Sequence, residues 1–185
     1  MEAVSLWADE LRLKSPSMLL ETVRRSHGHL PRDGIQRTLA HEICLIPSAE
    51  RRRLFYDVFA LLCTPECIDD RDGGGYTVAH MAAQYGDITI LELIRKLRPG
   101  ALDVPTTNEQ RYPMHFAVQA GCIEAVKLIE SVAPQSFARH SVENRYPLHT
   151  ACYNCDVDLV KYVYERYPPA AKARVEAHPH LGTCP

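Results

Sequence analysis

The fold is decided by residues 112–121, which read YPMHFAVQAG, because related stretches occur three more times in the chain. Their first four residues are TLAH at 38–41, TVAH at 77–80 and YPLH at 146–149. The histidines of the four stretches are His41, His80, His115 and His149. Successive histidines are separated by 39, 35 and 34 residues. A motif that returns at a nearly constant interval of this size predicts a repeat architecture, with a local insertion in the first interval.

A run of small residues follows the motif in the last three copies. It reads AAQYG at 82–86, AVQAG at 117–121 and ACYNC at 151–155. Small side chains allow a short helix to lie close to its neighbours, and a terminal glycine accepts the left-handed backbone that ends a helix. Each motif therefore predicts a short, closely packed first helix.

A second helix is predicted after each first helix. The segments ILELI at 90–94, AVKLI at 125–129 and LVKYV at 159–163 place one charged residue between two apolar pairs, which is typical of an amphipathic helix. VFALL at 58–62 occupies the same place in the first unit, where we expect a longer helix that runs from Ser48 as N-cap through Leu62.

A turn is predicted before each motif, because residues that cap or accept turn geometry stand about five positions earlier. These residues are Asp33 or Gly34, Asp72 or Gly73, Thr107 or Asn108, and Ser141 or Val142. The short oxygen-bearing side chains among them can bond to turn amides, so a hairpin tip is expected between successive helix pairs.

The units resemble ankyrin repeats, with YPMH and YPLH where that family usually has Thr-Pro-Leu-His. The resemblance covers residues 33–178 and implies an all-α solenoid of stacked antiparallel helix pairs with projecting hairpin loops. The array would contain about four units, with the expected boundaries 33–71, 72–106, 107–140 and 141–178.

Several residues depart from the family pattern. Tyr112 and Tyr146 replace the threonine of the motif, and Gln110 and Asn144 replace the turn glycine that is present as Gly75. Cys155 replaces the glycine that ends the first helix. We therefore expect these loops to be less regular than is usual for the family.

The two ends fit the repeat less well. Residues 1–32 suggest two short amphipathic helices, one with Leu6, Trp7 and Leu11 and one with Leu19, Leu20 and Val23. A repeat stack needs a terminal element with one polar face, so we expect residues 1–32 to form an N-terminal helical cap. Residues 179–185 resemble the start of a truncated further repeat, which suggests a segment of a longer array or multidomain protein. In that case Leu159, Val160 and Val163 would be partly exposed.

The composition is typical of a folded globular chain, with 46% hydrophobic and 24% charged residues. A net charge of −2 disfavours both nucleic acid and an anionic membrane as partners, and the basic run Arg51-Arg52-Arg53 is interpreted as a solvated helix face. The acidic N-terminus lacks the pattern of a secretory signal, and the seven cysteines show no disulfide framework. We expect a cytoplasmic protein, with the nucleus as the alternative.

The sequence predicts no enzyme, no cofactor and no metal site. The four motif histidines occupy one structural position, so their repetition is explained by hydrogen bonds between the turns of neighbouring units. Cys152 and Cys155 form a Cys-x-x-Cys pair, which leaves a metal- or redox-responsive protein as an alternative. Cys152 also falls in the position of Ala83 and Val118, where a thiol is expected to be a small buried hydrophobe.

The resemblance implies where a partner binds, since the varied positions of ankyrin repeats are the hairpin tips and the outward places of the first helices. Tyrosine and arginine recur at binding hot spots, so a protein or peptide of mixed character is the expected partner. The positions carried over as partner-binding residues are Gln84, Tyr85, Glu109, Arg111, Gln119, Glu143, Arg145, Tyr153 and Asn154, with Ala120 and Asp72 beside them. The alternative is that the array contacts another domain of its own longer chain.

Overall fold

The computed structural model describes residues 15–25, 36–46, 49–154 and 156–175, and within them it is helical without strands. The first part contains α2 (Pro16–Arg25), α3 (Leu39–Cys44), α4 (Ala49–Arg53), α5 (Tyr56–Leu62) and α6 (Pro65–Asp69). Three helix pairs follow, each ending in a short 3-10 helix. They are α7 (Val78–Gln84), α8 (Ile88–Leu97) and η1 (Pro99–Asp103); α9 (Pro113–Gln119), α10 (Ile123–Val132) and η2 (Pro134–Ala138); and α11 (Pro147–Tyr153), α12 (Val157–Arg166) and η3 (Pro168–Lys172).

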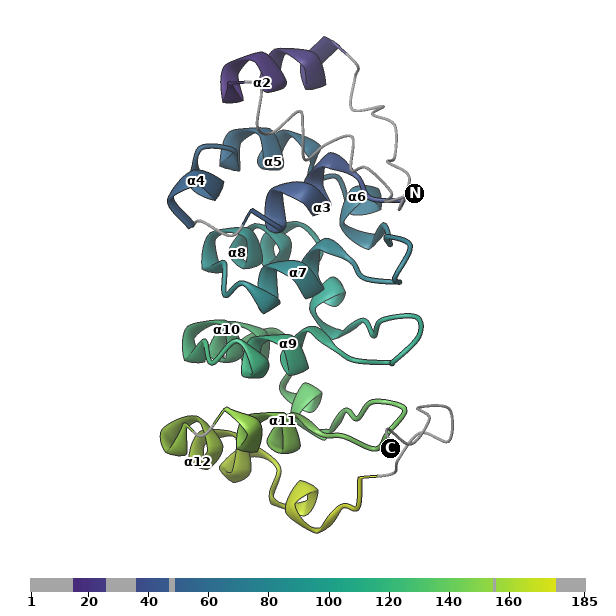
Figure 1. Ribbon diagram of the computed structural model, residues 1–185, viewed down its shortest axis with the longest axis vertical. Coiled ribbons are helices and arrows are strands. Elements are labelled where there is room, and N and C mark those ends of the chain that lie inside the picture. Colours follow the sequence, from purple (N-terminus) through teal and green to yellow (C-terminus); the bar gives the residue numbers. More distant parts are fainter. Residues whose placement is uncertain (1–14, 26–35, 47–48, 155, 176–185) are drawn as a thin grey trace, which may run out of the picture.

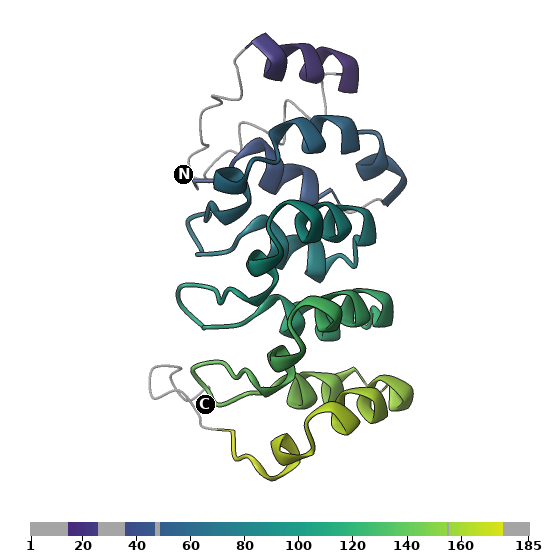
Figure 2. The same cartoon turned by 180° about the vertical axis from the view of Figure 1, so that it is seen from behind.

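The helix pairs stack along the long axis of the molecule (Figure 1). The first helices α3, α7, α9 and α11 pack against one another in that order, and α8 packs against α10 in the row of second helices. The loops between pairs project on the side away from the second helices, as both views show (Figures 1 and 2). The expected all-α solenoid of antiparallel helix pairs with hairpin loops is confirmed.

The motif histidines join each unit to the next. In each of the four units Nδ1 accepts a hydrogen bond from the backbone N–H of the residue that precedes the first helix. Nε2 therefore carries the proton, and it donates to the carbonyl oxygens of Tyr76, Arg111, Arg145 and Ala173 at 3.3, 3.2, 2.9 and 3.2 Å. The predicted turn-to-turn hydrogen bonding is confirmed, and it explains why the histidine recurs.

The hairpin turns keep one backbone conformation despite their different residues. Gly75 has a φ of 82°, while Gln36, Gln110 and Asn144 occupy the same left-handed region at 62°, 51° and 56°. The expectation of less regular loops was wrong at Gln110 and Asn144. Both hairpins are closed by backbone hydrogen bonds, which hold the unfavourable conformation in place.

One continuous apolar core runs through the stack. Met81 and Phe116 are both 3% exposed, which confirms that the residues after the motif histidines pack between units. α2 packs against α5 and buries Leu19 and Val23 completely or nearly so. The other expected N-terminal helix, with Leu6, Trp7 and Leu11, lies outside the described residues, and the capping role of residues 1–32 stays a prediction.

The insertion in the first unit contains α4. His41 and Pro65 are separated by 24 positions, whereas His80 and Pro99 are separated by 19, so five additional residues precede α6. The single helix expected from Ser48 to Leu62 is wrong, because the chain turns between α4 and α5 at Leu54 and Phe55. This turn buries Phe55 and sends α5 back against α2.

Arg52 corrects the interpretation of the basic run as a solvated face. It is 3% exposed, and its Nε donates to Asp87 at 2.5 Å while Nη1 donates to the carbonyl of Ile46. Asp87 also accepts from Tyr56 and from the N–H of Ile90 at the start of α8. The insertion is therefore tied to the next unit by a buried, hydrogen-bonded charge pair.

The C-terminal unit differs from expectation in two ways. Leu159 and Val163 are each 1% exposed, because they pack within their own unit against α11 and η3, and Val160 is half-buried. Cys152 is exposed rather than buried, since no further first helix covers it among the described residues as α9 covers Ala83. The proposed truncated repeat at 179–185 lies outside the described residues.

No helix in the described ranges has the length and apolar character to span a membrane.

Candidate functional site

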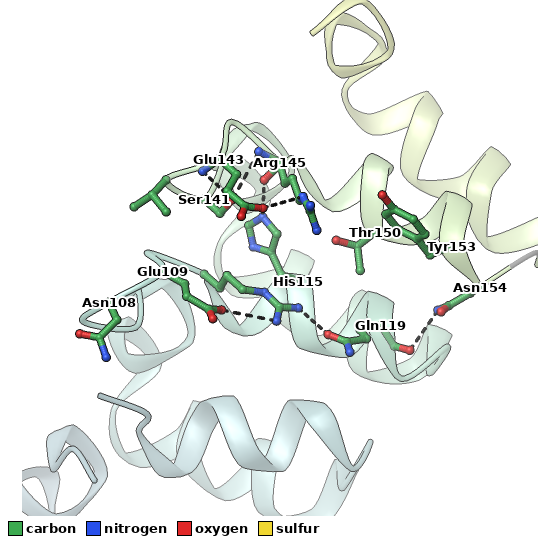
Figure 3. Close-up of a pocket in the computed structure, with 12 residues that line it drawn as sticks. Asn108, Glu109, His115, Gln119, Ser141, Glu143, Arg145, Thr150, Tyr153 and Asn154 are labelled. Carbon is green, nitrogen blue, oxygen red and sulfur yellow. Dashed lines mark hydrogen bonds and ion pairs between the residues drawn. The ribbon is translucent and has the colours of Figure 1, made fainter. Parts of the chain in front are cut away.

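A pocket of about 590 Å³ opens between two successive hairpins and the first helices beside them (Figure 3). We call it the hairpin pocket. Its lining residues are Asn108, Glu109, Arg111, His115, Gln119, Ser141, Val142, Glu143, Arg145, Thr150, Tyr153 and Asn154. Seven of the nine residues predicted from the sequence to bind a partner lie in this set. Their role in binding stays a prediction, although the structure brings them together.

Backbone and side-chain hydrogen bonds fix both hairpins. In the 106–111 hairpin Thr106 N–H donates to the carbonyl of Arg111, and the hydroxyl of Thr106 accepts from the N–H of Arg111 at 3.0 Å. In the 141–145 hairpin Ser141 pairs with Arg145 in the same way, at 3.0 Å between backbone atoms. The N–H of Val142 then donates to the carbonyl of Glu109, so a backbone hydrogen bond joins the two hairpins.

Arg111 is held in place by three neighbours. Its Nη2 donates to Oε1 of Gln119, and its guanidinium carbon lies 4.3 Å from the ring centre of Phe116. Nη1 lies 3.8 Å from the carboxylate of Glu109, which is beyond hydrogen-bonding distance. Arg111 and Gln119 therefore form a preorganised floor whose polar groups are largely engaged with each other.

Arg145 is engaged less completely. Its Nε lies 2.8 Å from Oε2 of Glu143, yet the two atoms are not aligned for a hydrogen bond. The side chain keeps 43% of its surface accessible. Thus the two arginines of equivalent hairpins differ, since the side chain of Arg111 is 24% accessible and hydrogen-bonded to Gln119, whereas that of Arg145 is more accessible.

The first helices supply the rest of the wall. Tyr153 is 73% exposed at the end of α11, where it presents a large ring to the pocket (Figure 3). Asn154 donates from its amide to the carbonyls of Val118 and Gln119, so it caps the end of α9 across the unit boundary. This hydrogen bonding gives Asn154 a structural task in addition to the one predicted.

Gln84 and Tyr85 lie outside the hairpin pocket. They end α7, one unit earlier, and the ring of Tyr85 lies 5.5 Å from the guanidinium carbon of Arg52. The hairpin residue Asp72 is buried and accepts from the N–H groups of Gly74 and Tyr76, which makes it a turn-forming residue. Ala120 is exposed but does not line the pocket.

Sequence reasoning did not select five lining residues, which are Asn108, His115, Ser141, Val142 and Thr150. Burial lowers the pKa of His115 to about 4, so its ring is neutral near pH 7. Both of its nitrogens bond to backbone groups, which leaves neither available for proton transfer. Asn108, Ser141 and Val142 belong to the predicted turns, so the sequence held a signal for them. The only signal for Thr150 is that it directly follows a motif histidine.

The alternative with a metal or redox centre at Cys152 and Cys155 stays untested. Cys155 lies outside the described residues, and Cys152 is exposed. Where the structure describes the chain, no three side chains of His, Cys, Asp or Glu gather closely enough to hold a metal ion.

No protein-family model matches the sequence. The chain is 31% identical over 132 residues to a probable serine/threonine-protein kinase from Dictyostelium discoideum, in an alignment that covers 67% of this chain and 14% of that protein. The chain thus spans about a seventh of the length of this curated relative.

The structure is similar to the crystal structure of the ankyrin repeat domain of Bcl-3, a member of the IkappaB protein family. The TM-score is 0.66 at 19% sequence identity, and the superposition covers 87% of this chain and 69% of that domain. Stacked helix pairs, projecting hairpins and histidines that bridge successive turns agree with this likeness. The chain therefore has the ankyrin-repeat fold.

Proposed function

We propose that the chain is a non-catalytic protein-interaction module that holds a segment of a partner protein in the hairpin pocket. The observation that carries this proposal is the convergence of predicted contact residues from two units on one cavity of about 590 Å³. A cavity of this size accommodates several side chains of a bound segment.

The surroundings of the pocket suit binding better than chemistry. The hairpin backbones are fixed before a partner arrives, which reduces the entropy lost on association. Tyr153 and Arg145 offer a rigid aromatic surface and an accessible guanidinium, both frequent at binding hot spots. His115, the histidine that lines the pocket, is buried, neutral and bonded at both nitrogens.

A matched pair of tyrosine variants tests the proposal. Tyr153→Ala removes an exposed ring from the pocket, whereas Tyr85→Ala removes a ring outside it. Proteins captured from cells by the tagged chain would be quantified by mass spectrometry for both variants and for the parent. We expect Tyr153→Ala to lose a captured partner that Tyr85→Ala retains, with unchanged helical circular dichroism. Equal capture by both variants would reject the hairpin pocket as the binding surface.

A second candidate is that the partner is another part of a longer natural chain. This candidate is favoured by one observation, which is that the region aligned with this chain makes up only 14% of the curated relative. Cross-linking mass spectrometry on the longest natural product of the gene distinguishes the two. Intramolecular cross-links to Lys96 or Lys127 that are unaffected by Tyr153→Ala would count against a partner held in the hairpin pocket.

A further inference from the structure

We infer that the hairpin pocket recognises a pair of opposite charges on its partner segment, a side-chain carboxylate at Arg145 and a basic side chain at Glu109. This inference rests on the proposed function and names the chemistry of the partner. It starts from the two Glu-x-Arg hairpins, residues 109–111 and 143–145, which have the same sequence pattern but different side-chain contacts.

Arg145 is the group in the hairpin pocket that can bind a carboxylate. Its guanidinium donates no hydrogen bond to any residue in the described ranges, and its one ion pair, with Glu143, is on the Nε side. The two Nη atoms can therefore offer parallel donors, the geometry in which arginine binds a carboxylate. Arg111 cannot serve in this way, because Gln119, Glu109 and the ring of Phe116 already surround it.

Glu109 is the complementary group. Its side chain is 56% accessible, and its closest cation is Nη1 of Arg111 at 3.8 Å, so that pair is loose. Glu143 is less suited to a ligand cation, since only 20% of its side chain is accessible and Arg145 Nε lies against it. A basic side chain of a partner can hydrogen-bond to Glu109 without breaking an existing hydrogen bond.

The charge balance of the pocket favours the two contacts together. Glu109, Glu143 and Arg145 all influence the guanidinium of Arg111 electrostatically, so the four side chains form one cluster with a formal charge of zero. A lone carboxylate on Arg145 would leave an excess negative charge beside two glutamates. A segment that carries one acid and one base keeps the cluster neutral, which suits a pocket that loses water on binding.

Selection from a random peptide library tests the inference. Phage-displayed dodecamers would be selected on the complete chain and on the variants Arg145→Glu and Glu109→Lys, with Arg95→Glu on α8 as the control. We expect peptides selected on the parent to share an acid and a base at a fixed separation. Arg145→Glu should remove only the preference for the acid, Glu109→Lys only the preference for the base, and Arg95→Glu should change neither.

Affinity measurements on the selected peptides complete the test. Peptides would be synthesised with a C-terminal amide, so that only a side-chain carboxylate can bind to Arg145, and we expect Arg145→Ala to weaken binding roughly tenfold to a hundredfold. Binding that depends on a free C-terminus would overturn the assignment to a side chain. Peptides that bind in a Tyr153-dependent manner without a charge pair would refute the inference and leave the proposed function standing. Failure to select any peptide would count against both.

Discussion

Two of the buried motif histidines, His80 and His115, predict a loss of stability in mild acid. Burial lowers the pKa of both His80 and His115 to about 4, whereas a histidine in the unfolded chain titrates near its ordinary value of about 6.5. Between these values the unfolded chain binds more protons than the folded chain. The free energy of unfolding is therefore at its full value above pH 6.5 and falls as the pH decreases toward 4.

The size of the effect follows from the two pKa values. At pH 5 each histidine is expected to lower the free energy of unfolding by about 2 kcal/mol relative to pH 7, and the pair by about 4 kcal/mol. Most carboxylates titrate below this range, so the histidines dominate it. His115→Gln should reduce the change between pH 7 and pH 5 by about 2 kcal/mol, whatever its own effect at pH 7.

Urea denaturation followed by circular dichroism at the two pH values measures this difference. His140→Gln, at an exposed histidine, provides the control for the loss of an imidazole elsewhere in the chain. Histidine-selective NMR gives a direct reading, with the Nε2-protonated neutral ring of His115 expected to persist at pH 5. The reasoning is refuted if His115 titrates between pH 6 and 7, or if His115→Gln leaves the pH dependence unchanged.

Three further predictions concern stability. Gln110→Gly should raise the free energy of unfolding by about 1 kcal/mol, because the left-handed backbone at φ 51° is unfavourable for glutamine. Conversely, Gly75→Ala should lower it by more than about 1 kcal/mol, since its Cβ would lie 2.6 Å from Thr107 at φ 82°. Arg52→Ala should cost about 3 kcal/mol by leaving Asp87 buried without its cation, while the neighbouring exposed Arg53→Ala should change stability by less than about 0.5 kcal/mol. Thermal and urea denaturation of each matched pair measures these differences, and equal effects within the arginine pair or a gain from Gly75→Ala would contradict the argument.

The architecture was predictable because the motif encodes contacts between neighbouring units. The regular interval between the histidines indicated the repeat. The hydrogen bond from His115 to the carbonyl of Arg145 in the next unit is the physical reason for that interval. Left-handed turns at Gln110 and Asn144 were not predicted as regular, because side-chain preference alone disfavours them. Closure of the hairpin by backbone hydrogen bonds decides the conformation there.

The first unit was predicted less well, because its insertion is defined by a contact that is remote in sequence. Arg52 appears in the sequence as one of three consecutive arginines, and nothing local distinguishes it from its neighbours. Its burial depends on Asp87, which lies 35 residues away at the start of α8. The same limitation applies to Gln84 and Tyr85, which occupy the right repeat positions but lie one unit away from the cavity.

Hydrogen exchange of the chain, alone and with a partner captured in a Tyr153-dependent manner, tests the central claim most directly. We predict that the partner slows amide exchange in the hairpins at 106–111 and 141–145 and in α11, while α8 and α10 keep their exchange rates. Protection confined to α8, α10 and α12, with no change in the two hairpins, would contradict the assignment of function to the hairpin pocket.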